Sequence, residues 1–308
     1  MTSSVIEWLL QGDISLQYQT YRDLMDDDRR ELQQRILLEG WGERFLSFRN
    51  EDGSWGKGFY RPKWTCSNYT LLDLKALAVL PDHFLIRESI HAFARSLKGR
   101  DGGINPARTV KVSDVCINGM FLNYACYFGE KQDLFESIVD FILDQKMEDG
   151  GFNCKRNRSQ GTRHSSLHST LAVLEGVFEY KNNGYMYRVD ELTKAATEAI
   201  EFILRHRFFK SDHTGKIIHG DLLKLSFPPR WKYNILRALD FFRLAQVPWD
   251  ERMSDAVSVI LRKRRADKWW HAESFLPGVT HFTMEEAGKP SRWNTLIAKR
   301  VLKYYKIE

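Results

Sequence analysis

Apolar residues recur along almost the whole chain at the intervals that are typical of amphipathic helices. Positions i, i+3, i+4 and i+7 carry apolar side chains in window after window, which predicts helices with one buried face. Six windows that also contain small or polar residues cover 14–25, 67–80, 113–128, 166–180, 230–246 and 291–306. More plainly amphipathic windows alternate with them at 30–48, 83–98, 134–146, 191–207 and 250–264, with a short one at 5–10. No alternating run of β-branched residues indicates a hairpin of strands. The pattern therefore predicts an all-α chain of about twelve helices.

A repeated turn separates these helical windows. It contains Asp-Gly followed by an aromatic or apolar residue, as in FLSFRNEDGSWG (45–56), FARSLKGRDGGIN (93–105) and FILDQKMEDGGFN (141–153). Asp52, Asp101 and Asp149 are thus 49 and 48 residues apart. Degenerate copies follow as FILRHRFFKSDHTGKI (202–217) and VILRKRRADKWW (259–270). A period of this length, with two helical windows in each unit, indicates a repeated helical hairpin.

Stacking of these hairpins decides the predicted architecture. Each hairpin must cover its apolar face against the next one, and a stack closes when the rotation per repeat returns it to its start. We therefore expect an α/α toroid of about six helical hairpins, rather than an open superhelix of the HEAT or TPR kind, whose signatures are absent. No Pro/Ser-rich linker or change of composition interrupts the units, so residues 1–308 are expected to form a single domain.

Composition and charge restrict the classes of function. The 308 residues are 43% hydrophobic and 28% charged, and no apolar run approaches the ~20 residues of a membrane helix. The start of the chain lacks the features of a secretory signal, so we expect a cytoplasmic protein. The net charge of +6 is spread along the chain without a basic block or a nucleic-acid-binding motif, so no nucleic-acid partner is predicted. The cysteines, Cys66, Cys116, Cys126 and Cys154, are too few for a disulfide framework, which leaves metal binding or reactivity open.

Three predicted helix starts place a basic residue directly before a tryptophan. The pairs are Lys63-Trp64, Arg230-Trp231 and Arg292-Trp293. If the helix starts gather at one rim of a ring, these pairs predict a mouth that binds an anionic head above an apolar interior, because helix N-termini favour anions. An alternative explanation is structural, since proline is a favoured helix starter and tryptophan anchors loops to a core.

The segment GGINPARTVKVSDVCINGM (102–120) carries the sharpest chemical pattern. Its residues Arg108, Lys111, Asp114 and Cys116 follow a Gly-Gly turn at intervals of three, three and two. The segment resembles the Arg-x-x-Lys-x-x-Asp-x-Cys pattern of the β subunits of protein farnesyl- and geranylgeranyltransferases. Together with the repeats, it makes the chain similar to the terpenoid cyclase and protein prenyltransferase superfamily, whose fold is the α/α toroid.

The resemblance implies roles for these residues. Arg108 and Lys111 would hold an isoprenoid diphosphate, and Asp114 and Cys116 would bind zinc. The third zinc ligand of the family is a histidine in the next repeat, which is either His164 or His168 in this chain. Three protein ligands leave a position open for a substrate, as in catalytic zinc sites. The resemblance therefore implies a zinc-dependent prenyltransferase-like protein that takes an isoprenoid or lipid-like molecule.

The chain also departs from the pattern of that family. Cys66 stands where those enzymes have a histidine near the pair Tyr69-Thr70, and Ile117 replaces the aromatic residue that usually follows the zinc cysteine. The alternative hypothesis is a non-catalytic toroid that binds a lipid or a partner protein. Squalene-type cyclisation is disfavoured, because the acidic run 26–28 is not the Asp-x-Asp-Asp motif of the cyclases.

Overall fold

The structure is a computed structural model that describes residues 3–107, 110–157, 159, 161–273 and 277–308. In these ranges the regular structure is helical and β-structure is limited to isolated bridges, which confirms the all-α prediction. The α-helices are α1 (Ser3–Leu10), α2 (Ile14–Leu24), α3 (Arg30–Arg35), α4 (Gly40–Ser47), α5 (Ser67–Ala76), α6 (Phe84–Ser96), α7 (Val115–Tyr127), α8 (Glu136–Asp144), α9 (Leu167–Asn182), α10 (Val189–Arg205), α11 (Ile235–Leu244), α12 (Ser254–Lys263) and α13 (Arg292–Tyr304). Short 3-10 helices are η1 (Gln132–Leu134), η2 (Gly220–Leu223) and η3 (Glu251–Met253).

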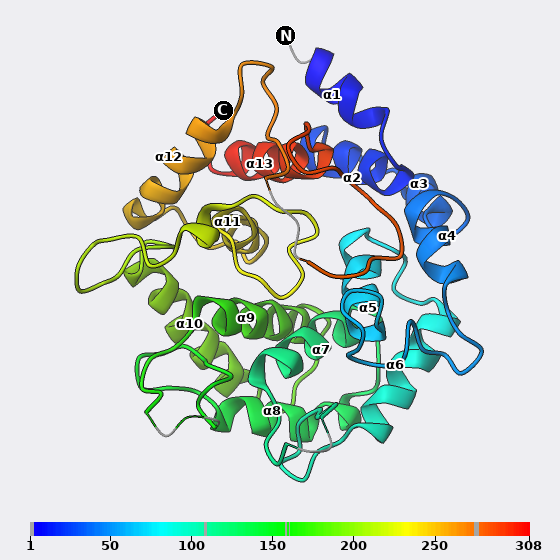
Figure 1. Ribbon diagram of the computed structural model, residues 1–308, viewed down its shortest axis with the longest axis vertical. Coiled ribbons are helices and arrows are strands. Elements are labelled where there is room, and N and C mark those ends of the chain that lie inside the picture. Colours follow the sequence, from blue (N-terminus) through cyan, green and yellow to red (C-terminus); the bar gives the residue numbers. More distant parts are fainter. Residues whose placement is uncertain (1–2, 108–109, 158, 160, 274–276) are drawn as a thin grey trace.

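The helices alternate between the centre and the outside of the molecule. In Figure 1, helices α2, α5, α7, α9, α11 and α13 lie nearer the centre, and α4, α6, α8, α10 and α12 lie outside them. Helix α7 packs against both α5 and α9, and α13 packs against both α11 and α2. The last helix of the chain therefore contacts a helix near its beginning. No helix in the described part of the chain has the length and apolar character needed to cross a membrane.

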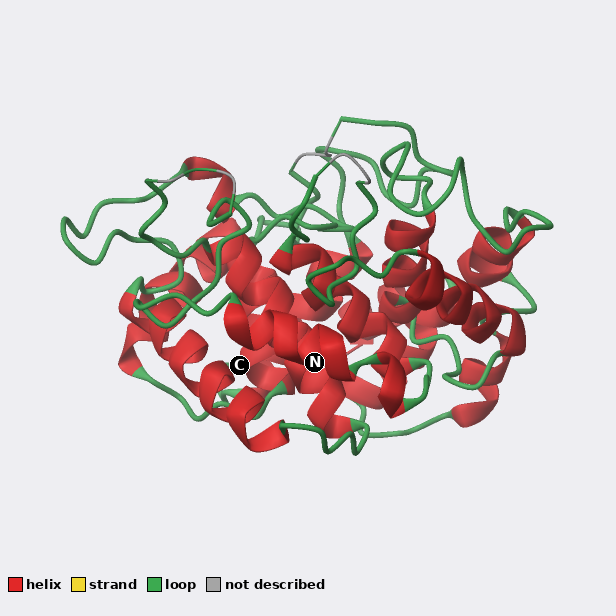
Figure 2. Cartoon of the chain, turned by 90° about the horizontal axis from the view of Figure 1, so that it is seen from below, coloured by secondary structure: helices red, strands yellow, loops and turns green. Residues whose placement is uncertain are grey.

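The connections differ sharply in length. Those that lead into a central helix cover 48–66, 97–114, 145–166, 206–234 and 264–291, whereas the returns to an outer helix cover 77–83, 128–135, 183–188 and 245–253. Figure 2 shows the long connections gathered on one side of the helical layer, which we call the loop face. The N-termini of the central helices that follow these connections point toward the loop face.

The aspartate of each repeated turn holds the turn in place. The carboxylate of Asp101 accepts the backbone N–H of Ser113 at 2.6 Å and its hydroxyl at 2.8 Å. The carboxylate of Asp149 accepts the same two groups of Ser165. These hydrogen bonds tie the second and third turns to the segment that leads into the next central helix, whereas Asp52 accepts the N–H and the hydroxyl of Ser54 within its own turn.

A second hydrogen bond recurs directly after the turn. A backbone N–H donates to a polar side chain of the next central helix, in the pairs Trp55 to Ser67, Ile104 to Asn118, Phe152 to Thr170 and Trp270 to Thr295. The indole N–H groups of Trp55 and Trp270 also donate to equivalent carbonyls, those of Phe45 and Ile260. The degenerate copy at 259–270 thus keeps the geometry of the first copy although it lacks Asp-Gly.

One predicted helix is broken in two. The window 30–48 forms α3 and α4, because the first helical run ends at Arg35 and residues 36–39 form a turn. Gly40 follows this turn with a left-handed backbone, φ of +71°, and is the first residue of α4. The Asp13 carboxylate then accepts the N–H of Trp41 at 2.7 Å and so fixes the start of α4.

Two glycines bring α7 and α9 unusually close together. A Cβ atom on Gly119 would lie 2.5 Å from the carbonyl oxygen of Ala172, and one on Gly176 would lie 2.4 Å from the carbonyl oxygen of Gly119. Both neighbours are backbone atoms that cannot rotate away. The two helices therefore pack backbone to backbone at this crossing.

A buried arginine links the two ends of the chain. Arg300 in α13 donates to Asp23 in α2 at 2.8 Å and forms an ion pair with Asp240 in α11. Its side chain is only 11% exposed. Arg22 and Arg243 also pair with these two carboxylates, so the charges form a network across α2, α11 and α13.

Candidate functional site

A cavity of about 300 Å³ lies among the central helices, and we call it the central cavity. Each of α2, α5, α7, α9, α11 and α13 contributes lining residues, as does the loop 226–230 before α11. A volume of this size is at the lower end of what small-molecule sites occupy. Part of the wall is apolar, formed by Leu72, Phe178, Phe227, Leu236, Phe241 and Trp293.

The rest of the wall is charged. Six basic and four acidic side chains line the cavity, so the basic ones are in excess. Most of them form ion pairs across helices. Arg237 in α11 donates both to Glu175 Oε1 at 2.7 Å and to Glu175 Oε2 at 2.6 Å, and Lys75 in α5 lies 2.8 Å from Glu179 in α9. Such pairs join the central helices across the cavity, and charged lining residues come from α2, α5, α9, α11 and α13.

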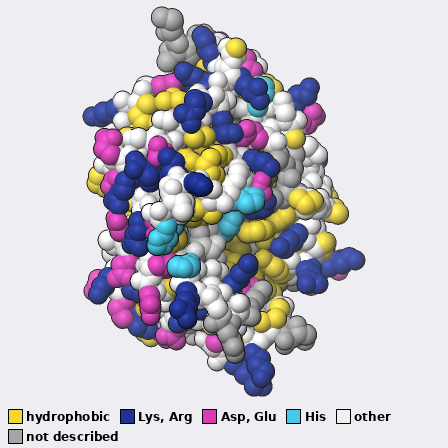
Figure 3. Space-filling model, turned by 60° about the vertical axis from the view of Figure 1, so that its left-hand side comes forward, with side chains coloured by type: hydrophobic (Ala, Val, Ile, Leu, Met, Phe, Trp, Pro, Cys, Tyr) yellow, Lys and Arg dark blue, Asp and Glu magenta, His cyan; other side chains and the backbone are white. Residues whose placement is uncertain are grey.

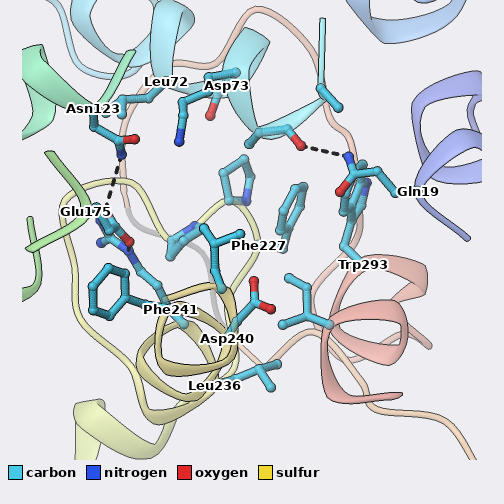
Figure 4. Close-up of a pocket in the computed structure, with 18 of the residues that line it drawn as sticks. Gln19, Leu72, Asp73, Asn123, Glu175, Phe227, Leu236, Asp240, Phe241 and Trp293 are labelled. Carbon is cyan, nitrogen blue, oxygen red and sulfur yellow. Dashed lines mark hydrogen bonds and ion pairs between the residues drawn. The ribbon is translucent and has the colours of Figure 1, made fainter. Parts of the chain in front are cut away.

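Within the described part of the chain, two buried polar atoms of the cavity residues have no hydrogen-bond partner. They are Asn123 Oδ1 and the indole nitrogen of Trp293, whose side chains are nearly completely buried. Figure 4 shows Asn123 beside Glu175, to which its amide nitrogen donates at 3.4 Å, with Trp293 on another wall. The assignment of the Asn123 amide follows from this contact, because the opposite orientation would place two oxygen atoms together. An unpartnered buried acceptor and donor each cost free energy unless a ligand or water satisfies them.

Arg230 lies between the central cavity and a second one, which we call the outer cavity. The outer cavity has a volume of about 190 Å³ and shares Phe227, Pro228 and Arg230 with the central cavity. Arg230 forms a buried ion pair with Asp73 in α5, and its backbone adopts a left-handed φ of 56°. A non-glycine residue in this conformation is strained, which is common at functional sites. Burial raises the pKa of Asp73 to about 6, although the charge of Arg230 opposes this shift.

The structure corrects the predicted helix start at residue 230. Helix α11 begins at Ile235, and its N-cap is Asn234, whose side chain accepts the N–H of Arg237. The left-handed backbone of Arg230 and the preceding Pro228-Pro229 belong to a loop instead of a first helical turn. Lys63 and Trp64 likewise precede α5 within a loop, whereas Arg292 is the first residue of α13.

Two of the predicted basic-aromatic pairs come together on the loop face. The Lys63 ammonium lies 5.6 Å from the Trp64 ring and 5.7 Å from the Trp231 ring, and the Arg230 guanidinium lies 5.7 Å from Trp64. The His168 ring packs against Trp231 at 5.3 Å between centroids. We call Lys63, Trp64, His168, Arg230 and Trp231 the rim cluster. It combines cations with aromatic surface next to the outer cavity.

The other predicted substrate-binding residues lie elsewhere. Arg292 donates to the carbonyl of Trp8 at 3.0 Å, and Trp293 is buried against Phe227 with ring centroids 4.5 Å apart. Trp293 therefore reaches the central cavity without joining the rim cluster. Lys111 is exposed, and Arg108 lies outside the described residues.

The predicted zinc ligands are only partly brought together. The charge of Asp114, the N-cap residue of α7, acts on both Cys116 and Cys154, and the backbone N–H of Cys116 donates to Cys154 Sγ at 3.2 Å. His168 uses Nδ1 to accept the N–H of Tyr233 at 2.8 Å, and burial lowers its pKa to about 4. His164 is exposed, because α9 begins only at Leu167. In the described part of the chain, no three His, Cys, Asp or Glu side chains are grouped as a metal site.

Charges on the outer surface are mixed. On the face drawn in Figure 3, Lys and Arg side chains are interspersed with Asp and Glu over the whole surface. Several of the exposed basic residues form ion pairs, for example Arg188 with Asp140 and Glu191. On this face the basic side chains therefore alternate with carboxylates and do not form a separate basic patch.

Several cavity residues were not predicted from the sequence. These are mainly the polar residues of the central helices, Asp73, Asn123, Glu175, Arg237, Asp240 and Arg300. A signal for them was available, since each interrupts an otherwise apolar helix, as in TLLDLKA (70–76) and LAVLEGVF (171–178). A charged residue on a buried helix face needs a partner, so such positions indicate either an ion pair or a binding site.

Neither the protein-family models nor the curated protein sequences that were compared with this chain match it. The geometry of the cavities and of the rim cluster is therefore the basis on which its function has to be argued.

Proposed function

We propose that this chain is a prenyltransferase-like α/α toroid of about six helical hairpins that binds an amphipathic anion in its central cavity. An isoprenoid diphosphate is the leading candidate for the ligand. The contact between α13 and α2, together with the contribution of every central helix to one cavity, supports the closed ring. The ring would present its long loops and helix N-termini at a single mouth.

The observation that carries the proposal is the combination of an apolar wall with unsatisfied polar groups. Aromatic and aliphatic side chains offer a surface for a hydrocarbon chain, while Asn123 Oδ1 and the Trp293 indole N–H call for a donor and an acceptor. A ligand head, or water held between the head and the wall, would supply both. The excess of basic side chains favours an acidic head over a neutral one.

Arg230 is the residue best placed to hold the anionic head. It lines both cavities and belongs to the rim cluster, so it lies between the loop face and the central cavity. Asp73 already pairs with it, and the raised pKa of Asp73 favours uptake of a proton when an anion replaces the carboxylate. Arginine suits this role because its planar fork binds two phosphate oxygens at once.

Titration with farnesyl diphosphate tests the proposal. We expect wild type to bind the diphosphate and Arg230→Gln to bind it about ten- to a hundred-fold more weakly, since a charge-assisted hydrogen bond contributes roughly 1.5–3 kcal/mol. Arg108→Ala and Lys111→Ala test the cation pair implied by the resemblance, for which we expect a loss in the same range. Isothermal titration calorimetry gives the affinities, and circular dichroism verifies that each variant folds.

Two controls decide the outcome. Farnesol has the same hydrocarbon chain without the charge, so it should bind much more weakly than the diphosphate. Asp73→Asn keeps the shape of its partner while freeing Arg230, so it should bind the diphosphate at least as well as wild type. Equal affinity for farnesol and the diphosphate would disprove the anion site and favour the non-catalytic scaffold that binds a lipid or a partner protein.

Zinc content tests the catalytic part of the proposal. If Asp114, Cys116 and His168 hold zinc, protein purified without added metal should contain about one zinc per chain, and Cys116→Ser should lose it, because three ligands define a catalytic zinc site. Elemental analysis of both proteins measures this. Cys126→Ser is the matched control, since Cys126 is buried in α7 away from Asp114. Wild type without zinc, or Cys116→Ser with undiminished zinc, would remove the zinc-dependent transferase from consideration.

A further inference from the structure

Cys116 and Cys154 form a pair of neighbouring thiols on the loop face. Cys116 lies in the first turn of α7, and Cys154 follows the repeated turn that contains Asp149. The backbone N–H of Cys116 donates to Cys154 Sγ at 3.2 Å, and the proximity of the Cys116 side chain lowers the pKa of the Cys154 thiol. The hydroxyl of Ser169 donates to the same sulfur at 3.4 Å. The two sulfur atoms are therefore held side by side by groups from α7 and α9.

The pair differs from the other cysteines in access. Cys116 and Cys154 are partly exposed, whereas Cys66 and Cys126 are completely buried. Reagents in solution can reach partly exposed thiols, while buried ones are inert. Neither member of the pair lines the central or the outer cavity. Chemistry at these sulfurs is thus separable from ligand binding in the cavities.

We propose that Cys116 and Cys154 form a redox-active dithiol that a small-molecule disulfide converts into an intramolecular disulfide. A thiolate of the pair attacks one sulfur of the small-molecule disulfide, which forms a mixed disulfide and releases one small-molecule thiol. The neighbouring protein thiolate then attacks the protein sulfur of the mixed disulfide and releases the second small-molecule thiol. The protein loses two protons and two electrons, which together are two hydrogen atoms, and the small-molecule disulfide gains them. The new bond joins the start of α7 to the loop before α9.

The position of the two thiols and the local charge favour an intramolecular disulfide over a mixed disulfide that stays on one cysteine. Because Cys154 Sγ already lies against the backbone of Cys116, closure is intramolecular and outpaces capping by a second small molecule. The sulfur of Cys154 also sits at the N-terminus of α7, where backbone N–H groups and the helix dipole favour negative charge. We therefore expect the mixed disulfide to be short-lived and not to accumulate.

Glutathione disulfide is the probe that tests the proposal. Reduced full-length protein is incubated with it in the presence of a chelator, so that no metal protects the thiols, and the products are analysed by intact mass and non-reducing peptide mapping. We expect wild type to lose the mass of two hydrogens and to give one cross-linked peptide that joins Cys116 to Cys154. Cys126→Ser, which removes a buried thiol, should give the same cross-link at the same rate.

Single variants of the pair trap the intermediate. Cys116→Ser and Cys154→Ser should each keep one glutathione on the remaining cysteine, because no partner thiol resolves it. A stable glutathione adduct on wild type, unmodified thiols after long incubation, or a cross-link that involves Cys66 or Cys126 would each overturn the proposal. The wild-type cross-link decides the question even if a serine variant fails to fold.

Discussion

Replacing Arg300 by methionine is expected to lower the free energy of unfolding by about 3 kcal/mol. Methionine keeps most of the side-chain volume but leaves the carboxylates of Asp23 and Asp240 with less compensating charge in a buried position. Breaking a buried pair by removing one partner costs about 3–5 kcal/mol. Because Arg22 and Arg243 still contact the two carboxylates, the lower end of this range is expected. Urea unfolding followed by circular dichroism measures the loss.

Arg35 provides the matched control for Arg300. It forms an ion pair with Glu39 one helical turn away, and its side chain is 51% exposed. Exposed pairs of this kind contribute at most about 0.5 kcal/mol, so Arg35→Met should unfold almost like wild type. If Arg300→Met lost less than about 1 kcal/mol, the contact between α13 and α2 would not depend on this network.

The crossing of α7 and α9 should be the second most sensitive point of the fold. In Gly119→Ala the added methyl group would lie 2.5 Å from the carbonyl oxygen of Ala172 and 2.7 Å from the Cα of Val173, so the helices must move apart. Overpacking of this kind costs about 1–3 kcal/mol, and occasionally more, while the better helix propensity of alanine returns roughly 1 kcal/mol. Because backbone atoms cannot rotate away, we expect a net loss of about 2 kcal/mol in urea unfolding.

Gly220→Ala is the control for this substitution. No atom lies within 4 Å of the position that its Cβ would take. Its stability should stay within about 0.5 kcal/mol of wild type, as for most surface substitutions. A Gly119→Ala protein as stable as wild type would mean that the two helices separate without cost, which the close approach at Gly176 argues against.

Local features of the chain were predictable and distant pairings were not. The all-α class and the turns around Asp52, Asp101 and Asp149 depend on residues within one repeat, so helical periodicity and Asp-Gly spacing indicate them directly. The ion pair between Asp73 and Arg230 joins residues 157 positions apart. A single sequence contains no information on which of its buried charges meet.

The misplaced start of α11 has a specific cause. Proline is favoured in the first turn of a helix, and Pro228-Pro229 followed by an apolar pattern therefore predicted a helix from residue 230. In the structure Asn234 caps the helix instead, and the residues before it form the boundary between the two cavities. The local signal that is typical of a helix start here belongs to a loop that lines both cavities.

The residues of the rim cluster were predicted only in part, because their meeting in space depends on the fold. The basic-aromatic pairs are visible in the sequence, but only the fold brings Lys63 to Trp231 and separates both from Arg292. The proximity of Cys154 to Cys116 is likewise a property of adjacent repeats in space. The zinc site, the diphosphate pair and the single domain remain predictions.

The link between Arg300 and Asp23 has a consequence for synthesis of the protein. The two residues are 277 positions apart in the chain, so at about 5–20 residues per second the ribosome needs roughly 14–55 s to supply the partner of Asp23. Until then α2 exposes a surface made to pack against α13. During this interval every nascent chain therefore carries an uncovered helix face and an Asp23 carboxylate that is paired only with its neighbour Arg22. The contact that joins the two ends of the chain can form only after α13 has been synthesised.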